Sequence, residues 1–166
     1  MAKKKKSSVG SIFYLVACVL GIAAVCMMFL RAVAVPDVKT AFGTVETDAG
    51  FTGLEVIFGY EEEGVKGLAF SFMALLPYLL VVAGIVLTVV NLLKKKGGLL
   101  NYVSVGLFVV GGILMFLMPS FMAFADTVAG AVLEKVEYEL AVGSILAGVL
   151  SILAGAVVLV KSLLKK

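Results

Sequence analysis

The feature that most constrains this chain is a lysine cluster followed by an apolar run long enough to cross a bilayer. Four lysines at residues 3–6 precede residues 12–30, which carry no charge. A helix rises about 1.5 Å per residue, so about 20 residues cover the roughly 30 Å hydrocarbon core. Lysines before such a run hold that end in the cytoplasm. The sequence predicts a first span over residues 11–31 that begins in the cytoplasm.

A cleaved secretory signal is the alternative interpretation of this segment. Ala32, Val33 and Ala34 match the A-x-A pattern of a cleavage site. However, the apolar region of a signal has about 7–15 residues, and the run here is longer. We therefore expect an uncleaved membrane anchor.

The composition calls for lipid as the solvent of most of the chain. Of the 166 residues, 62% are hydrophobic and 15% are charged, against about 45–50% and 25% in soluble domains. We predict an all-α membrane protein, a four-transmembrane-helix bundle forming a single membrane domain over residues 1–166. The first span is followed by a loop at 32–67, a second span at 68–93, a turn at 94–98, a third span at 99–118, a loop at 119–139, a fourth span at 140–160 and a tail at 161–166.

The distribution of charge indicates which way this layout faces. All eleven acidic residues fall in the two predicted loops, whereas ten of the 14 basic residues fall at the N-terminus, in the 94–98 turn or in the tail. Positive charge marks the cytoplasmic side. We expect a multi-pass protein of the cell membrane with both termini in the cytoplasm and both loops outside.

The first loop has the pattern of a small β structure. From Phe51 to Tyr60 it is rich in β-branched and aromatic residues, with Leu54, Val56, Phe58 and Tyr60 at alternate positions. A turn of three glutamates and Gly64 follows, and residues 65–69 fit a returning strand. We predict an extracellular β-hairpin cap, with residues 41–46 as a possible third strand. A lone hairpin is marginal in water, so it should pack on the membrane domain or on a neighbouring copy. The residues expected to make contacts outside are Leu54, Val56, Phe58 and Tyr60.

The second loop is shorter and also acidic. In its second half Val132, Leu133, Val136 and Leu140 recur at helical spacing. We expect this half to extend the fourth span into water as one continuous helix.

Small residues at helical spacing are the most specific feature of the spans. Such residues let helices approach closely in lipid, where packing drives association. The stripe has two interpretations, packing within the four-helix bundle or contact with another chain. Its members are Ala17 and Gly21 in the first span and Ser144, Ala147, Gly148, Ser151 and Gly155 in the fourth.

The residue types in the sequence argue against catalysis, metal binding and proton-coupled transport. The sequence has no histidine, and the interiors of the predicted spans have no Asp, Glu, Lys or Arg. His-dependent triads and metal sites, and proton-coupled carriers, need such groups. The short lysine runs lack the interleaved aromatics of a nucleic-acid site. We expect no catalytic residue, no cofactor, no metal site and no nucleic-acid partner.

The segments FTGLEVIFGY, from Phe51 to Tyr60, and LAFSFMALLPY, from Leu68 to Tyr78, resemble a pattern that recurs in small bacterial four-span membrane proteins of unknown function. The layout is also similar in architecture to claudins and other tetraspan proteins. The claudin first loop carries a W-GLW-C-C pattern, and this sequence has neither Trp nor loop cysteines. The resemblance implies an architecture and no activity.

These observations favour a non-enzymatic structural or interaction protein surrounded by membrane lipid. It would associate with itself as a homo-oligomer or act as an accessory subunit beside a partner membrane protein. The alternative is an oligomeric channel, for which the acidic loops would favour cations at the extracellular mouth.

Overall fold

The computed structural model describes residues 2–36, 38–40, 43–45, 49–94 and 98–164. The chain divides into two compact units. The helical unit comprises Met1–Cys26, Pro77–Leu114 and Ala147–Lys166, and the cap unit comprises Met27–Leu76 and Met115–Leu146.

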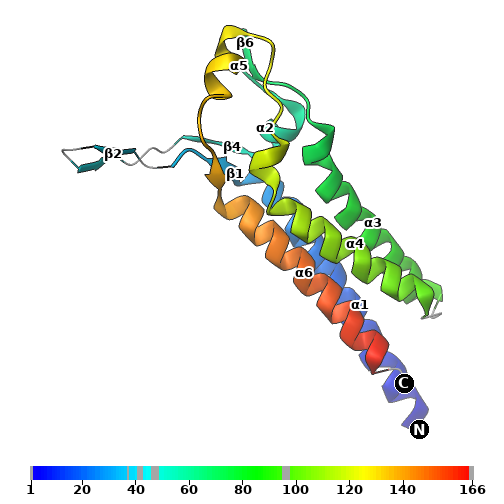
Figure 1. Ribbon diagram of the computed structural model, residues 1–166. Helices are drawn as coiled ribbons and strands as arrows, with labels where there is room; N and C mark the ends of the chain where they lie inside the picture. The colour runs from blue at the N-terminus through cyan, green and yellow to red at the C-terminus, as the bar shows by residue number, and fades with distance from the viewer. Residues whose placement is uncertain (1, 37, 41–42, 46–48, 95–97, 165–166) are drawn as a thin grey trace. The chain divides into compact units, whose positions relative to one another are not determined.

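Four long apolar helices dominate the structure (Figure 1). They are α1 (Ala2–Cys26), α3 (Phe72–Lys94), α4 (Leu99–Met115) and α6 (Val142–Leu163). Residues Gly10–Phe29, α3 and α6 are long and apolar enough to cross a membrane, and α4 is apolar but shorter. The prediction of a mostly helical chain with several apolar helices is therefore confirmed.

The helix ends differ from the predicted spans where the chain forms strands or tight turns. After α1 comes a 3-10 turn, η1 (Met27–Phe29), and Arg31 already belongs to a strand. α4 ends at Met115 and is followed by the 3-10 turn η2 (Met118–Phe121), whose first turn contains Pro119. Proline fits the first turn of a helix because no hydrogen bond is required of its nitrogen there. The predicted spans run past these breaks because they rest on hydrophobicity alone.

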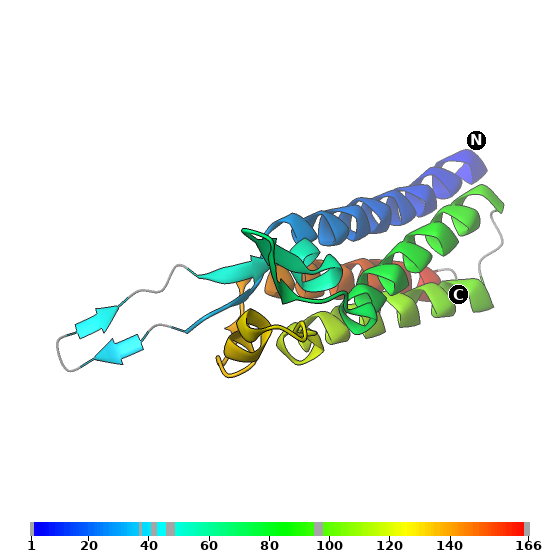
Figure 2. The same ribbon diagram turned by 90° about the horizontal axis from the view of Figure 1, so that it is seen from above.

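The cap unit combines both loops in one antiparallel sheet. Its strand order is β4 (Gly50–Thr52), β1 (Arg31–Ala34) and β7 (Glu139–Leu140). Val33 lies opposite Phe51 on one side and Leu140 on the other. A second sheet pairs β2 (Val38–Thr40) with β3 (Gly43–Val45), as Figure 2 shows. The second loop thus adds a strand to the first.

The predicted hairpin is present but shorter than expected. β5 (Tyr60–Glu62) pairs with β6 (Val65–Leu68) in the third sheet. Glu63 and Gly64 both have positive φ, 51° and 80°, which is the backbone that a tight hairpin turn requires. Of the residues 41–46 predicted as a possible third strand, Gly43–Val45 form β3, which pairs with β2 and not with this hairpin. Residues 41, 42 and 46 lie outside the described part.

The prediction of a strand through Leu54, Val56 and Phe58 is wrong, because this stretch is a helix, α2 (Gly53–Phe58). A capping box starts it. The Glu55 backbone N–H donates to Thr52 Oγ1 at 3.3 Å, and the Thr52 backbone N–H donates to the Glu55 carboxylate at 2.7 Å. These bonds satisfy two amides at the helix start and outweigh the strand preference of the β-branched residues.

The continuous helix predicted for the second half of the second loop is also wrong. A separate short helix, α5 (Val128–Leu133), begins at the N-cap Thr127, and strand β7 separates it from α6. The extended backbone at Glu139 and Leu140 pairs with β1, which a continuous helix could not do.

The second loop also packs on the hairpin of the first. Thr127 Oγ1 donates to the Lys66 carbonyl, and the Ala125 backbone N–H donates to the Gly67 carbonyl at 3.1 Å. Aromatic rings from both loops contact one another in the cap unit: the ring centroid of Phe51 lies 5.2 Å from that of Tyr60 and 6.1 Å from that of Tyr138. The hairpin is therefore stabilised by the other loop of the same chain.

Candidate functional site

The small-residue stripe of α6 lies on a buried face. Ser144, Ala147, Gly148, Ser151 and Gly155 are all buried. In the helical unit, Ser151 Oγ donates to the Phe108 carbonyl of α4 at 2.7 Å. A Cβ placed on Gly112 of α4 would lie 2.8 Å from the Gly148 carbonyl oxygen. The backbones of α4 and α6 therefore approach so closely that a side chain at Gly112 does not fit.

The centre of the helical unit is the ring of Phe108, which is fully buried. Glycines from three other helices face the Phe108 side chain. A Cβ added at Gly21 of α1 would lie 3.0 Å from the ring, one at Gly84 of α3 3.2 Å from it, and one at Gly155 of α6 3.2 Å from the Phe108 Cβ. Ala17, one turn before Gly21, is also fully buried. Both predicted positions in the first span thus lie in the core of the helical unit.

The predicted loop residues separate into buried and exposed groups. Val56 is fully buried and Leu54 half-buried, as helical rather than alternating spacing requires. Phe58 is 60% exposed, and its ring centroid lies 6.3 Å from that of Phe70. Tyr60 is half-buried. Only Phe58 of the four presents most of its side chain for an outside contact.

Tyr60 has the clearest electrostatic coupling of the cap unit. Its hydroxyl donates to the Glu62 carboxylate at 2.8 Å. This hydrogen bond, followed by partial desolvation and the charges of Glu62 and Glu55, raises the pKa of Tyr60 above its ordinary value near 10. Burial similarly raises the pKa of Tyr138. Both tyrosines remain neutral at physiological pH.

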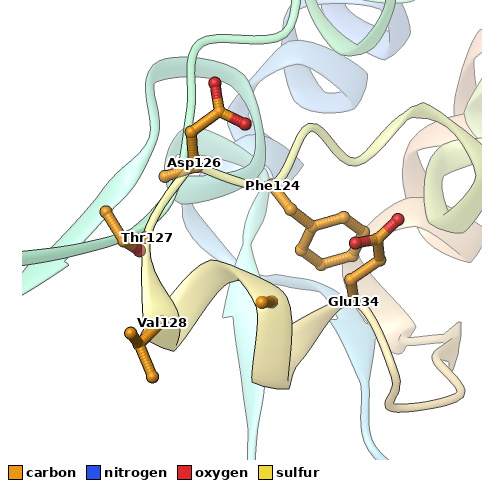
Figure 3. A pocket seen from close by; sticks show the side chains of 7 residues that line it. Phe124, Asp126, Thr127, Val128 and Glu134 are labelled. Carbon is orange, nitrogen blue, oxygen red and sulfur yellow. The ribbon is translucent and has the colours of Figure 1, made fainter.

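An open pocket of about 670 Å³ lies along α5 and the segment before it (Figure 3). Phe124, Ala131 and Val128 give it an apolar lining, while Asp126 and Glu134 add two carboxylates. Val128 is 85% exposed and points away from α5. Within the described residues these acids form no ion pair, and no group of three metal-ligating side chains occurs. The pocket thus combines apolar side chains with two carboxylates.

Polar side chains inside the helices were missed by the sequence reasoning. Four of them are at most 2% exposed and lie toward the Lys94 end of α3 or at the start of α4: Thr88, Asn91, Asn101 and Ser104. The search for ionisable residues passed over them because all four are neutral. Their signal in the sequence is helical spacing, since each pair is three residues apart and continues the buried face of its helix.

Comparisons with models of known protein families, with curated proteins and with solved structures found no match.

Proposed function

We propose that this chain is a four-span protein of the cell membrane that acts without catalysis, as an interaction subunit that recognises a partner through its cap unit. In this proposal α1, α3, α4 and α6 cross the membrane with the lysine-bearing ends in the cytoplasm. α4, with 17 residues, is at the short end of the range for a spanning helix. The 3-10 turn η2 follows α4 and lengthens this third span.

The observation that carries this proposal is the joint folding of the two loops. A strand from the second loop joins the sheet of the first, and Thr127 of one loop bonds Lys66 of the other. Ordering loops costs conformational entropy, and a fixed surface is what specific recognition needs. The exposed part of this surface combines Val128 and Val132 of α5, 85% and 60% exposed, with the carboxylates of Asp126 and Glu134.

The stripe of α6 is a poor candidate for the partner contact. Its glycine and serine atoms already contact α4 within the chain, so a partner would have to displace α4. Phe108 equally limits a channel, because it fills the centre of the helical unit. A conducting path would therefore have to run between copies.

Site-specific photo-crosslinking in intact cells tests the proposal. A photoreactive residue at Val128 should give a discrete crosslinked product, and mixing two tagged forms shows whether the captured protein is a second copy. Leu99, 80% exposed at the lysine-bearing end, provides the matched control position. The proposal is wrong if Val128 gives no discrete product, or only the products that Leu99 gives.

The membrane layout has a separate test. Protease added to intact cells should cut the loops and spare both termini, whereas removal of a C-terminal tag from intact cells would contradict the proposed orientation.

A further inference from the structure

Large apolar side chains are exposed in the cap unit where helix α2 ends and helix α3 begins. Phe58, the last residue of α2, is 60% exposed, and Phe70, Phe72 and Met73 are each more than half exposed. The ring centroids of Phe58 and Phe70 lie 6.3 Å apart. We call these four residues the junction patch. An exposed apolar group of this kind marks a surface that meets lipid or another protein.

The backbone holds the junction patch in place. The Ser71 backbone N–H donates to the Ile57 carbonyl at 2.8 Å, which ties the start of α3 to the end of α2. Ser71 Oγ donates in turn to the Phe121 carbonyl of η2. Ile57 and Ser71 are both buried. Because these neighbours occupy the interior of the cap unit, the rings of Phe58 and Phe70 are held at its surface.

The chain changes from acidic to apolar across the junction patch. Strand β5 follows Phe58 closely, and the three glutamates at residues 61–63 are all exposed. On α3, by contrast, every exposed residue from Phe72 to Leu93 is apolar, and the first charged residue is Lys94. The junction patch therefore lies between a charged hairpin turn and a continuous apolar helix face.

Continuity with α3 favours lipid over a protein chain as the occupant of this surface. α3 is long and apolar enough to cross a membrane, and such a helix exposes its apolar face to acyl chains. That face begins at Phe72 and Met73, with no charged residue before the remainder of the helix. Aromatic side chains are common where acyl chains give way to headgroups. The glutamates of the hairpin turn would then lie in the water beyond.

We propose that the junction patch anchors the cap unit in the membrane interface, with Phe58 and Phe70 inserted at the boundary between headgroups and acyl chains of the outer leaflet. The inference rests on the membrane placement in the proposed function. It goes beyond that function because it assigns the end of α2 to lipid, which makes Phe58 a lipid contact instead of a partner contact.

Single tryptophans measure this depth, because the sequence contains no tryptophan of its own. The test variants are Phe58→Trp and Phe70→Trp, in the full chain reconstituted into phosphatidylcholine vesicles that carry bromine either near the headgroup or near the end of the acyl chain. Val86→Trp reports the depth of the span, since Val86 is 55% exposed and lies about four turns along α3 from its start. Val65→Trp reports water, since Val65 is 49% exposed and lies opposite Glu62 in the hairpin.

We expect bromine near the headgroup to quench both test variants at least about twofold more than bromine near the chain end, because interfacial side chains reach only about 5–10 Å below the headgroups. Val86→Trp should show the opposite preference, and iodide supplied on both sides of the membrane should quench Val65→Trp. Iodide quenching of the test variants as strong as that of Val65→Trp would overturn the proposal, because the patch would then lie in water. Protection from iodide and from both lipids would overturn it too, because another protein chain would then cover the patch.

Val86→Trp separates this inference from the proposed function. If lipid bromine quenches Val86→Trp but neither test variant, the anchor is wrong and the membrane placement stands. If lipid bromine quenches none of the variants, both are wrong. Circular dichroism shows whether each variant folds, and Phe70→Trp decides the outcome if Phe58→Trp does not.

Discussion

Replacement of Phe108 by alanine should be among the most damaging single changes to the helical unit. The residue is fully buried; its ring meets Gly21 of α1 and Gly84 of α3, and its Cβ meets Gly155 of α6. In lipid the helices gain little from hydrophobicity, since the solvent is itself apolar, and packing contacts dominate their association. Removing the ring therefore removes a large part of what holds the four helices at this level.

The expected loss is set by the cavity left behind. Replacing phenylalanine by alanine leaves about 100 Å³ if the helices do not close, and at about 24 cal/mol per Å³ this destabilises the protein by about 2.4 kcal/mol. A buried phenylalanine in a soluble protein costs about 3–5 kcal/mol, because transfer from water adds to the cavity. We expect the lower figure here, since the ring remains in an apolar medium when the helices separate.

Reversible unfolding in mixed micelles, followed by circular dichroism, measures this loss. Phe72→Ala is the matched control, because Phe72 is 57% exposed and should change stability by less than about 0.5 kcal/mol. A Phe108→Ala protein as stable as the Phe72→Ala protein would refute the packing argument.

A second substitution tests the same contact, because its effect on stability should reverse when the Phe108 ring is removed. A Cβ at Gly84 would lie 3.2–3.3 Å from three ring atoms of Phe108, closer than most real contacts. Gly84→Ala should therefore destabilise the wild type. In the Phe108→Ala background the same alanine has room, and its better helix propensity, about 1 kcal/mol, should make it stabilising. Additive effects would show that Gly84 and Phe108 do not share a packing contact.

Three further predictions concern the cap unit. Thr52→Ala removes the cap of α2 and should cost about 1 kcal/mol in micelle unfolding, whereas Thr52→Ser should retain most of it; equal losses would contradict the capping box. Thr127→Ala removes the cap of α5 and the bond between the loops, so amide exchange should accelerate in both α5 and β6, and acceleration in α5 alone would argue against the bond between loops. Absorbance titration should place the Tyr60 pKa above 10, and Glu62→Gln should lower it. Because the pKa of Tyr60 is higher in the folded than in the unfolded state, this hydroxyl stabilises the folded protein below about pH 10. That stabilisation is lost as the pH rises through the pKa of the folded state.

The helices could be predicted because their signal is local and repeated along the sequence. An apolar run that ends in lysines predicts a helix without reference to the rest of the chain. The predicted ends were misplaced where Arg31, Leu68 and Leu140 enter strands and where α4 gives way to η2. The α2 error has a different origin. The Thr52 and Glu55 pattern was available as a capping-box signature, but the β-branched residues beside it were given more weight.

The cap unit could not be predicted as a single structure, because its contacts join residues far apart in the sequence. Val33 pairs with Leu140, and Thr127 with the carbonyl of Lys66, only once the two loops meet in the cap unit. No short-range pattern records this arrangement. Asn91 was missed for a simpler reason, since charge rather than hydrogen-bonding capacity was used to search the spans.

The glycine contacts also explain why one pattern admitted two interpretations. A stripe of small residues shows that something approaches closely, but not whether it is a helix of the same chain. Here the Gly148 carbonyl and the Ser151 hydroxyl both meet α4. A large side chain at either position would first separate α4 from α6. Any change in assembly that followed would be a consequence of altered folding, so surface positions such as Val128 are the informative places to look for a partner.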